Sequence, residues 1–265
     1  MPKAFAFGQN WRNFEKQATE QKITLSIEFL KRLLPDQDWR NTTFIDIGSG
    51  SGLSSVAARR LGATVSAMDV DPDSVEASIQ MFARFNVQCS VKLKSVFDVD
   101  SEVDGTYGVV YSWGVLHHTG EMWGAIRAAS KLVEPSGLFV IALYKKTRWD
   151  RFWIFEKQLY SRSGPAVQFL LRVPYKALYL LRKLTQGENP IRYIREYGAK
   201  NRGMSWHNDV HDWLGGWPYE SVTKDEIVKF MADQGFELVR DFVQEPGRFD
   251  GLLGSGCDEY VFQRI

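Results

Sequence analysis

The chain has 265 residues, a length that suits one α/β domain with an insertion and is ample for a sizeable core. Hydrophobic residues make up 44%, charged residues 25%, and the formal net charge is +1, values that exclude a disordered chain and give no overall signal for nucleic-acid binding. The two cysteines, Cys89 and Cys257, lie far apart, which argues against a disulfide framework or a zinc site.

The N-terminal region predicts a helical cover over residues 1–36. An aromatic segment, F-A-F-G-Q-N-W at 5–11, precedes an amphipathic pattern that predicts one helix over 13–34, ended by Pro35. Residues 1–17 lack the apolar run of a signal peptide, and no stretch approaches the length of a membrane span. We therefore expect a soluble, cytoplasmic protein.

The stretch F-I-D-I-G-S-G-S-G, residues 44–52, predicts a strand and a tight turn, and a helix over 53–61 follows. Glycine adopts positive φ and lets a ligand lie against the backbone, so we expect a nucleotide-like ligand here. The dinucleotide fingerprint G-x-G-x-x-G would need glycine where the chain has Leu53. Asp46, two positions before the first glycine, offers a carboxylate to a cationic ligand. A purely structural turn is the alternative.

A second buried strand, T-V-S-A-M-D at 64–69, ends in Asp69. Ligands of doubly wound sheets bind at the carboxyl ends of the strands, where an acidic residue about 20 positions past the glycines accepts the ribose hydroxyls. A carboxylate suits two neighbouring donors because it has two acceptor oxygens. The alternative role, capping the next helix, fits Asp71 or Asp73 better than Asp69.

Three further strands and a helix follow in an order that predicts a continuing α/β core. The third strand ends near S-V-F-D at 95–98, the fourth covers 107–112, and the fifth ends at Leu143. The next helix, 223–233, begins with a capping-box pattern only after about 75 residues, too many for a structureless loop. We expect core segments 37–144 and 221–265, with a substrate lid at 145–220 between them. The tail predicts an antiparallel strand pair.

The glycine turn, the acidic end of the second strand and the V-L-H-H motif at 115–118 together resemble the class I S-adenosylmethionine-dependent methyltransferases. Within that class the chain is similar to bacterial small-molecule enzymes of the ubiquinone-biosynthesis type. The resemblance implies a doubly wound, seven-stranded, mostly parallel sheet and S-adenosylmethionine as the cofactor. It implies cofactor contacts from Trp11, Asp46, Gly48, Gly50, Gly52, Asp69, Val70, Ser95, Val96, Phe97, Ser112 and Trp113. Phe7 joins Trp11 as a candidate cover residue, and an aromatic staple of the N-terminal helix is the alternative.

The predicted lid is strongly basic. Residues 145–202 contain 14 Lys and Arg against 4 Asp and Glu, a local excess of +10, and aromatic and aliphatic residues are interleaved with them. Three interpretations stay open: a solvated helical face, a site for an anionic or lipid-linked substrate, and an interfacial helix in peripheral contact with an anionic membrane. No RNA-binding module is recognisable, so we expect no nucleic-acid partner.

The end of the lid, R-G-M-S-W-H-N-D-V-H-D-W at 202–213, gathers two of the four histidines. His207 and His211 stand at i,i+4, but the glutamate of H-E-x-x-H is missing, so we expect no metal. Histidine suits a general base at neutral pH. The candidate bases are His118 and His207, and the candidate substrate contacts are Tyr144, Asp209 and His211. Histidines bonded to backbone in a structural hinge are the alternative.

These features predict O-methylation of a small molecule by in-line methyl transfer, with a secondary metabolite, a sugar or a lipid-linked intermediate as the acceptor. Two other functions stay open. One is a cofactor-binding accessory protein without transfer activity, and the other is an RNA methyltransferase. The sequence does not indicate an oligomeric state.

Overall fold

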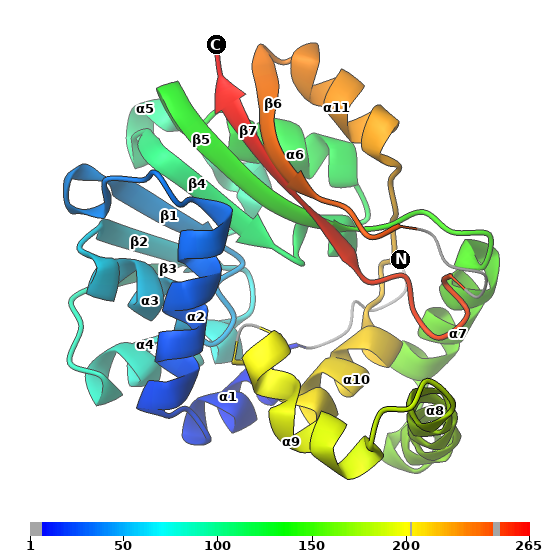
Figure 1. Ribbon diagram of the computed structural model, residues 1–265. Helices are drawn as coiled ribbons and strands as arrows, with labels where there is room; N and C mark the ends of the chain where they lie inside the picture. Colours follow the sequence, from blue (N-terminus) through cyan, green and yellow to red (C-terminus); the bar gives the residue numbers. More distant parts are fainter. Residues whose placement is uncertain (1–6, 202, 246–249) are drawn as a thin grey trace.

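A computed structural model describes residues 7–201, 203–245 and 250–265. Residues 1–6 of the predicted cover and Arg202 of the predicted lid lie outside this part. The centre is a seven-stranded sheet in the order β3-β2-β1-β4-β5-β7-β6 (Figure 1). The strands are β1 (Thr43–Ile47), β2 (Thr64–Asp69), β3 (Ser90–Leu93), β4 (Tyr107–Trp113), β5 (Val133–Tyr144), β6 (Phe236–Phe242) and β7 (Cys257–Arg264). β1 to β5 pair in parallel, and β7 runs antiparallel to both β5 and β6, which confirms the predicted fold class.

The helices of the described part follow the doubly wound pattern and then depart from it. The α-helices are α1 (Gly8–Lys16), α2 (Glu20–Leu33), α3 (Leu53–Leu61), α4 (Pro72–Arg84), α5 (Ser101–Asp104), α6 (Met122–Ser130), α7 (Asp150–Arg162), α8 (Pro165–Thr185), α9 (Pro190–Lys200), α10 (Trp206–Gly215) and α11 (Lys224–Ala232). Short 3-10 turns are η1 (Trp39–Asn41), η2 (Val96–Asp98) and η3 (Leu116–His118).

The sheet is buried on both faces. Val109 and Val110 are adjacent on β4 and fully buried, yet they belong to different core clusters, because side chains of a strand alternate between its faces. α2 and α3 supply the cluster around Val109, and α6 and α11 supply the cluster around Val110. The central strands can therefore be apolar at successive positions, and polar side chains gather where the strands end.

The bounds of α3 and β2 match the ranges that the sequence predicts, 53–61 and 64–69. The prediction of one helix over 13–34 is wrong, because α1 ends at Lys16 and α2 begins at Glu20. The hydroxyl of Thr19 accepts a hydrogen bond from the Lys22 N–H and caps α2. Apolar residues recur at three- and four-residue spacing on both sides of the break between α1 and α2. The spacing alone therefore does not predict that the helix is interrupted there.

The region between β5 and α11 is helical, and it leaves and rejoins the sheet at one place. Lys145 pairs with Val222 as an isolated parallel bridge, and the Val222 N–H donates to the Tyr144 carbonyl at 3.0 Å. α7, α8 and α10 pack with α9 around an aromatic cluster that includes Trp153, Tyr160 and Trp206. We use the word lid for this inserted region. Within the described ranges, no helix has both the length and the apolar character needed to cross a membrane.

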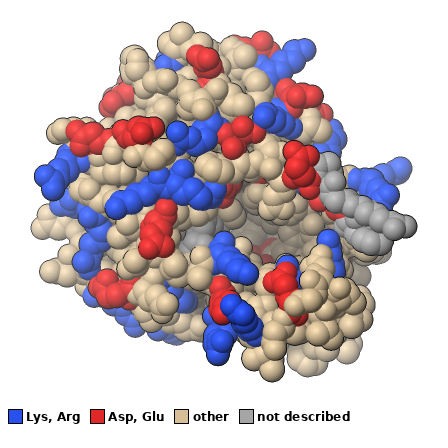
Figure 2. All heavy atoms as spheres, viewed as in Figure 1, with Lys and Arg blue, Asp and Glu red and all other residues tan. Residues whose placement is uncertain are grey.

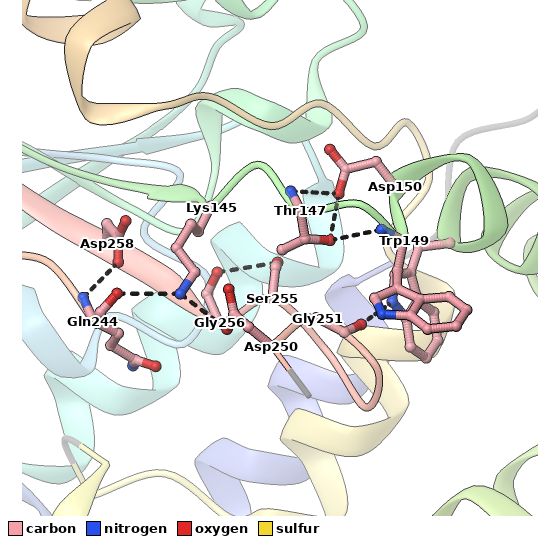
Figure 3. A network of polar contacts seen from close by, with 11 residues as sticks. Lys145, Thr147, Trp149, Asp150, Gln244, Asp250, Gly251, Ser255, Gly256 and Asp258 are labelled. Carbon is pink, nitrogen blue, oxygen red and sulfur yellow. Dashed lines mark hydrogen bonds and ion pairs between the residues drawn. The ribbon is translucent and has the colours of Figure 1, made fainter. Parts of the chain in front are cut away.

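The lid is also tied to the loop that precedes β7 (Figure 3). Lys145 Nζ contacts the Gln244 carbonyl at 3.2 Å and the Asp250 carboxylate at 3.0 Å. From the lid, the Trp153 indole N–H donates to the Gly251 carbonyl at 2.6 Å. These contacts hold the end of β5, the loop before β7 and α7 together.

The return to the core at α11 begins with the predicted capping box. The Thr223 hydroxyl accepts from the Glu226 N–H, and the Glu226 carboxylate accepts from the Thr223 N–H. We expect Thr223→Ala to lower the free energy of unfolding by about 1 kcal/mol, because one donor of the first turn loses its partner. Urea denaturation measures the change. The control is Thr185→Ala at the end of α8, expected to change stability by less than about 0.5 kcal/mol, and equal losses in both variants would contradict the capping role.

Candidate functional site

The glycine turn lies across the carboxyl end of β2. Gly48 and Ser49 donate their N–H groups to the Met68 carbonyl at 2.8 and 3.1 Å. Gly48, Gly50 and Gly52 have φ of +74°, +55° and +75°, the left-handed region that glycine adopts without strain. The three glycines therefore produce a turn on which the side chains of Val115, Trp11 and Phe82 pack closely.

The Asp69 carboxylate holds this turn in place. Its oxygens accept from the Gly50 N–H and from the Asp71 N–H, both at 2.9 Å. Burial raises the pKa of Asp69, and the backbone N–H donors of Asp71 and Gly50 oppose this shift. Asp71 caps α4 through the Asp73 N–H, as the sequence predicts, so the cap and the turn use different carboxylates.

α1 crosses from the core to the lid beside the turn. The Gly8 N–H donates to the Asp71 carboxylate at 3.0 Å on the core side. On the lid side, the Asn10 amide donates to the Asp212 carboxylate at 2.8 Å. Trp11 follows these residues in α1 and packs on Gly50, where a Cβ atom would come within 2.8 Å of its ring. The first turn of α1 thus connects the core to the lid through polar contacts.

A cavity of about 1390 Å³ extends from the glycine turn to the lid. The surface is hollowed near the centre of the face in Figure 2. The sequence-predicted residues that line this cavity are Trp11, Asp46, Gly48, Asp69, Val70, Ser95, Val96, Phe97, Trp113, His118, Tyr144 and Asp209. Phe7 lines it too. The structure therefore brings together residues that are up to about 200 positions apart in the sequence.

Three predicted cofactor contacts are not among the lining residues, and packing gives the reason. Gly50 is covered by the Trp11 ring, and Gly52 faces Phe82. Ser112 is fully buried, and its hydroxyl donates to the Ile47 carbonyl at 3.0 Å. The structure therefore does not bring Gly50, Gly52 and Ser112 to the surface of the cavity.

The structure does not bring His207 and His211, the predicted base and substrate contact, to the cavity. His207 is exposed, with Nδ1 3.0 Å from Lys176 Nζ, and His211 Nδ1 lies 2.7 Å from the Tyr160 hydroxyl. Neither lines the cavity, because α10 turns Asp209 and Asp212 toward it instead. Spacing places the two histidines on one face of a helix, but it does not say which face is turned inward.

His118 is the histidine that faces the cavity. Its Nδ1 lies 2.8 Å from the Pro218 carbonyl, so Nδ1–H donates there and Nε2 keeps a lone pair. Burial lowers the pKa of His118 to about 3; the charge of Lys157 adds to this, and the Pro218 and Gly216 backbone oppose it. His117 is fully buried behind it, with its ring 3.9 Å from that of Tyr144. The V-L-H-H motif thus supplies one neutral imidazole to the cavity.

Two further groups in the cavity wall were not predicted from the sequence. Asp212 is bound by Asn10, and burial raises its pKa well above the usual range. Tyr197 donates its hydroxyl to Asp209 at 2.8 Å. The i,i+3 spacing of Asp209 and Asp212 was the available signal, because it places both carboxylates on one helical face. Among the described residues, no group of three or more His, Cys, Asp and Glu side chains is arranged to hold a metal ion.

The sequence profile of a family described as "Methyltransferase domain" matches residues 17–240, which is most of the chain. The chain belongs to this methyltransferase family. The match and the sheet order confirm a class I methyltransferase fold, a class whose cofactor is S-adenosylmethionine.

Curated relatives of this methyltransferase include ubiquinone biosynthesis O-methyltransferases. The protein of that name from Xanthomonas campestris pv. campestris (strain B100) is 32% identical over 103 residues, 39% of this chain and 43% of the relative. The one from Xanthomonas oryzae pv. oryzae (strain PXO99A) is 30% identical over 110 residues, 42% of this chain and 46% of the relative. The chain therefore matches less than half the length of these relatives.

Solved structures show the same fold. Magnesium protoporphyrin IX methyltransferase from Synechocystis PCC 6803, with bound SAH, has a TM-score of 0.54 at 16% identity, over 92% of this chain and 84% of that one. PKMT2 from Rickettsia typhi, in complex with AdoHcy, has a TM-score of 0.59 at 13% identity, over 91% and 52%. At such low identity the likeness establishes the fold alone.

The packing of Trp11 on Gly50 predicts the effect of one substitution. We expect Gly50→Ala to lower the free energy of unfolding by about 1–3 kcal/mol more than Gly105→Ala, because the new Cβ would displace the Trp11 ring. Gly105 is a matched control, since it also has positive φ, +80°, and nothing lies within 4 Å of its added Cβ. Chemical denaturation of both variants measures the difference, and equal losses would show that Trp11 does not rest on the turn.

The lowered pKa of His118 predicts a pH dependence of stability. A histidine whose folded pKa is about 3 and whose unfolded pKa is about 6.5 destabilises the fold as pH falls below 6.5, because only the unfolded chain binds the proton. We expect wild type to lose about 1–2 kcal/mol relative to His118→Gln between pH 7 and pH 5.

Urea denaturation at each pH measures this difference. His207→Gln is the control, because that ring is exposed and its removal should leave most of the pH dependence in place. A pH dependence in His118→Gln that matches wild type would contradict a neutral, buried imidazole.

Proposed function

We propose that this chain is an S-adenosylmethionine-dependent methyltransferase that O-methylates a small-molecule acceptor. One observation carries the proposal: a single cavity has the glycine turn and Asp69 at one end and the neutral imidazole of His118 beside the lid. Family membership supports methyl transfer, and the relatives named as O-methyltransferases support oxygen as the acceptor atom.

The cavity residues fit the cofactor of the family. Asp69 keeps both carboxylate oxygens at the cavity wall, which suits the two ribose hydroxyls. Val70 and Phe97 offer exposed apolar surfaces, 71% and 47% accessible, to the adenine ring. Asp46, buried and accepting a hydrogen bond from the Ser55 hydroxyl at 2.7 Å, would offer a carboxylate to the positively charged methionine portion of the cofactor. Ser95 and Trp113 complete this end of the site.

The size of the cavity leaves room for an acceptor beside the cofactor. Its volume of about 1390 Å³ exceeds the roughly 300–1,000 Å³ of a typical single-ligand pocket. The lid contributes Trp213 and Asp209, the end of β5 contributes Tyr144, and α1 with its N-cap residue contributes Trp11 and Phe7. We assign this aromatic end, which includes His118, to the acceptor.

The charge of the cavity favours an uncharged acceptor. Its acidic lining residues are Glu28, Asp46, Asp69, Asp71, Asp209, Asp212 and Glu259, and its basic ones are Arg32, Lys94 and Lys200. The basic excess of the lid therefore does not extend into the cavity, which weakens the interpretation of an anionic substrate. An aromatic or lipid-linked alcohol or phenol fits this wall better than a phosphorylated compound.

The chemistry divides between the cofactor and the chain. S-adenosylmethionine, when bound, supplies an electrophilic methyl group. The chain aligns the acceptor oxygen with it, and such positioning is worth up to ~7–11 kcal/mol in well-oriented model reactions. His118 accepts a hydrogen bond from the acceptor hydroxyl at Nε2. Its lone pair is available throughout the neutral range, because the pKa of the imidazole is about 3. A base this weak contributes mainly by orienting the hydroxyl.

A methyl-transfer assay tests this assignment. The probes are catechols with and without a prenyl tail, incubated with methyl-labelled S-adenosylmethionine, and mass spectrometry locates the methyl group. We expect His118→Ala to lower turnover by about 10²-fold with little change in cofactor affinity. His207→Ala is the matched control and should retain activity, because its ring lies outside the cavity. Full turnover in His118→Ala, or equal loss in both variants, would remove the role given to His118.

A further inference from the structure

α8 presents an apolar face to solvent along its whole length. It has 21 residues, and none of them is buried. The exposed positions carry no charged residue: they are Pro165, Ala166, Val167, Phe169, Leu170, Val173, Pro174, Ala177, Leu178, Leu181, Leu184 and Thr185. Leu170 is 68% accessible, a value expected for a surface lysine rather than a leucine.

The inner half of α8 is the more polar half, the reverse of an ordinary surface helix. Arg172, Lys176, Arg182 and Lys183 occupy half-buried positions, as do Tyr175 and Tyr179. The Tyr175 hydroxyl donates to the Leu253 carbonyl at 2.8 Å, and Lys176 lies beside His207. The contacts of Tyr175 and Lys176 hold the polar side of α8 against the protein, so its apolar side faces solvent.

α7 adds a second exposed apolar surface next to α8. Phe152, Ile154, Phe155 and Leu159 are 36% to 66% accessible. The Gln168 amide of α8 donates to the Tyr160 carbonyl of α7, which holds the two helices together. More than half of the exposed large hydrophobic side chains in the described part of the chain belong to these two helices. In Figure 1 α8 lies at the lower right, and the surface there is mostly uncharged in Figure 2.

The cavity does not account for this surface. No residue of α7 or α8 lines it. An acceptor bound in the cavity would therefore leave the whole apolar face of α8 in water. Contiguous exposed apolar surface of this extent marks an interaction site.

The charge around the surface selects the partner. Residues 145–202 carry an excess of ten positive charges, whereas the remainder of the chain is net negative. A symmetric dimer through α8 would bring two such regions together, and like charges at an interface oppose association. An exposed apolar helical surface that also carries exposed arginines, here Arg151 and Arg162 of α7, is the pattern of a helix that lies in the plane of an anionic membrane surface.

We propose that the α7–α8 surface docks on an anionic lipid bilayer, with the outward face of α8 lying in the headgroup region. The exposed Arg151 and Arg162 of α7 reach the lipid phosphates, and their aliphatic stems extend the apolar contact. This inference goes beyond the proposed function and does not depend on it, because it uses no residue of the cavity.

Vesicle co-sedimentation of the full chain tests the proposal. The probes are vesicles of phosphatidylcholine alone and of phosphatidylcholine mixed with phosphatidylglycerol. We expect binding to the mixed vesicles only, weakened by added salt. The double variant Leu170→Glu with Leu178→Glu should bind at least about tenfold more weakly, because it places two carboxylates in the apolar face.

The matched control is Val103→Glu with Ile265→Glu, which adds the same charge at apolar positions that are 76% and 87% accessible and lie outside the lid. It should bind as wild type does, and thermal melting should show all three proteins folded. The proposal is overturned if wild type binds neither vesicle, binds both equally, or is weakened as much by the control substitutions. Light scattering that shows a dimer lost in the Leu170→Glu, Leu178→Glu variant, without vesicle binding, would assign the surface to a second copy of the chain instead.

Discussion

The Asp69 carboxylate is the contact on which the site depends. It accepts the Gly50 and Asp71 N–H groups, and so fixes the glycine turn against the end of β2. Trp11 rests on that turn at Gly50, and α1 carries Trp11 and Phe7 across to the lid. A buried carboxylate without these donors would be unfavourable. The same interaction therefore satisfies Asp69, shapes the cofactor end of the cavity and positions the aromatic cover.

Several contacts between the described parts of the lid and the core involve residues that line the cavity, such as Tyr144, Met204 and Asp212. Tyr144, Lys145 and Val222 join the sheet to both ends of the lid, and Lys145 also ties in the loop before β7. The Asn10–Asp212 contact closes the opposite side through α1. The acidic and aromatic wall faces inward, whereas the basic and apolar helices α7 and α8 face outward. We propose that the inward surface of the lid binds the acceptor and that the outward surface docks on a membrane.

Local sequence patterns predicted the core because local sterics determine them. The glycine turn, α3, β2 and the Thr223 cap need only backbone conformation and nearby hydrogen bonds, and each lies where the sequence placed it. Asp69 was found because a strand end and a glycine turn must meet at one edge of the sheet.

The differences between the predicted and the observed positions of site residues depend on tertiary packing. His207 and His211 share a helical face, but contacts with Tyr160 and Lys176 turn that face away from the cavity. Ser112 lies near the end of the predicted fourth strand, but its side chain is on the buried face of β4 and its hydroxyl donates to the Ile47 carbonyl. The inward carboxylate of Asp212 and the outward apolar face of α8 depend on how the lid helices pack, which periodicity alone does not determine.

Calorimetric titration of the full chain with S-adenosylhomocysteine and with NAD, in wild type and Asp69→Ala, tests the central claim most directly. We expect wild type to bind S-adenosylhomocysteine and not NAD. Asp69→Ala loses the carboxylate that holds the glycine turn, so it should bind S-adenosylhomocysteine at least about tenfold more weakly. Asp38→Ala, which removes an exposed carboxylate outside the cavity, should bind as wild type does. No binding of S-adenosylhomocysteine by folded wild type, or unchanged affinity in Asp69→Ala, would contradict the assignment of this cavity to the cofactor.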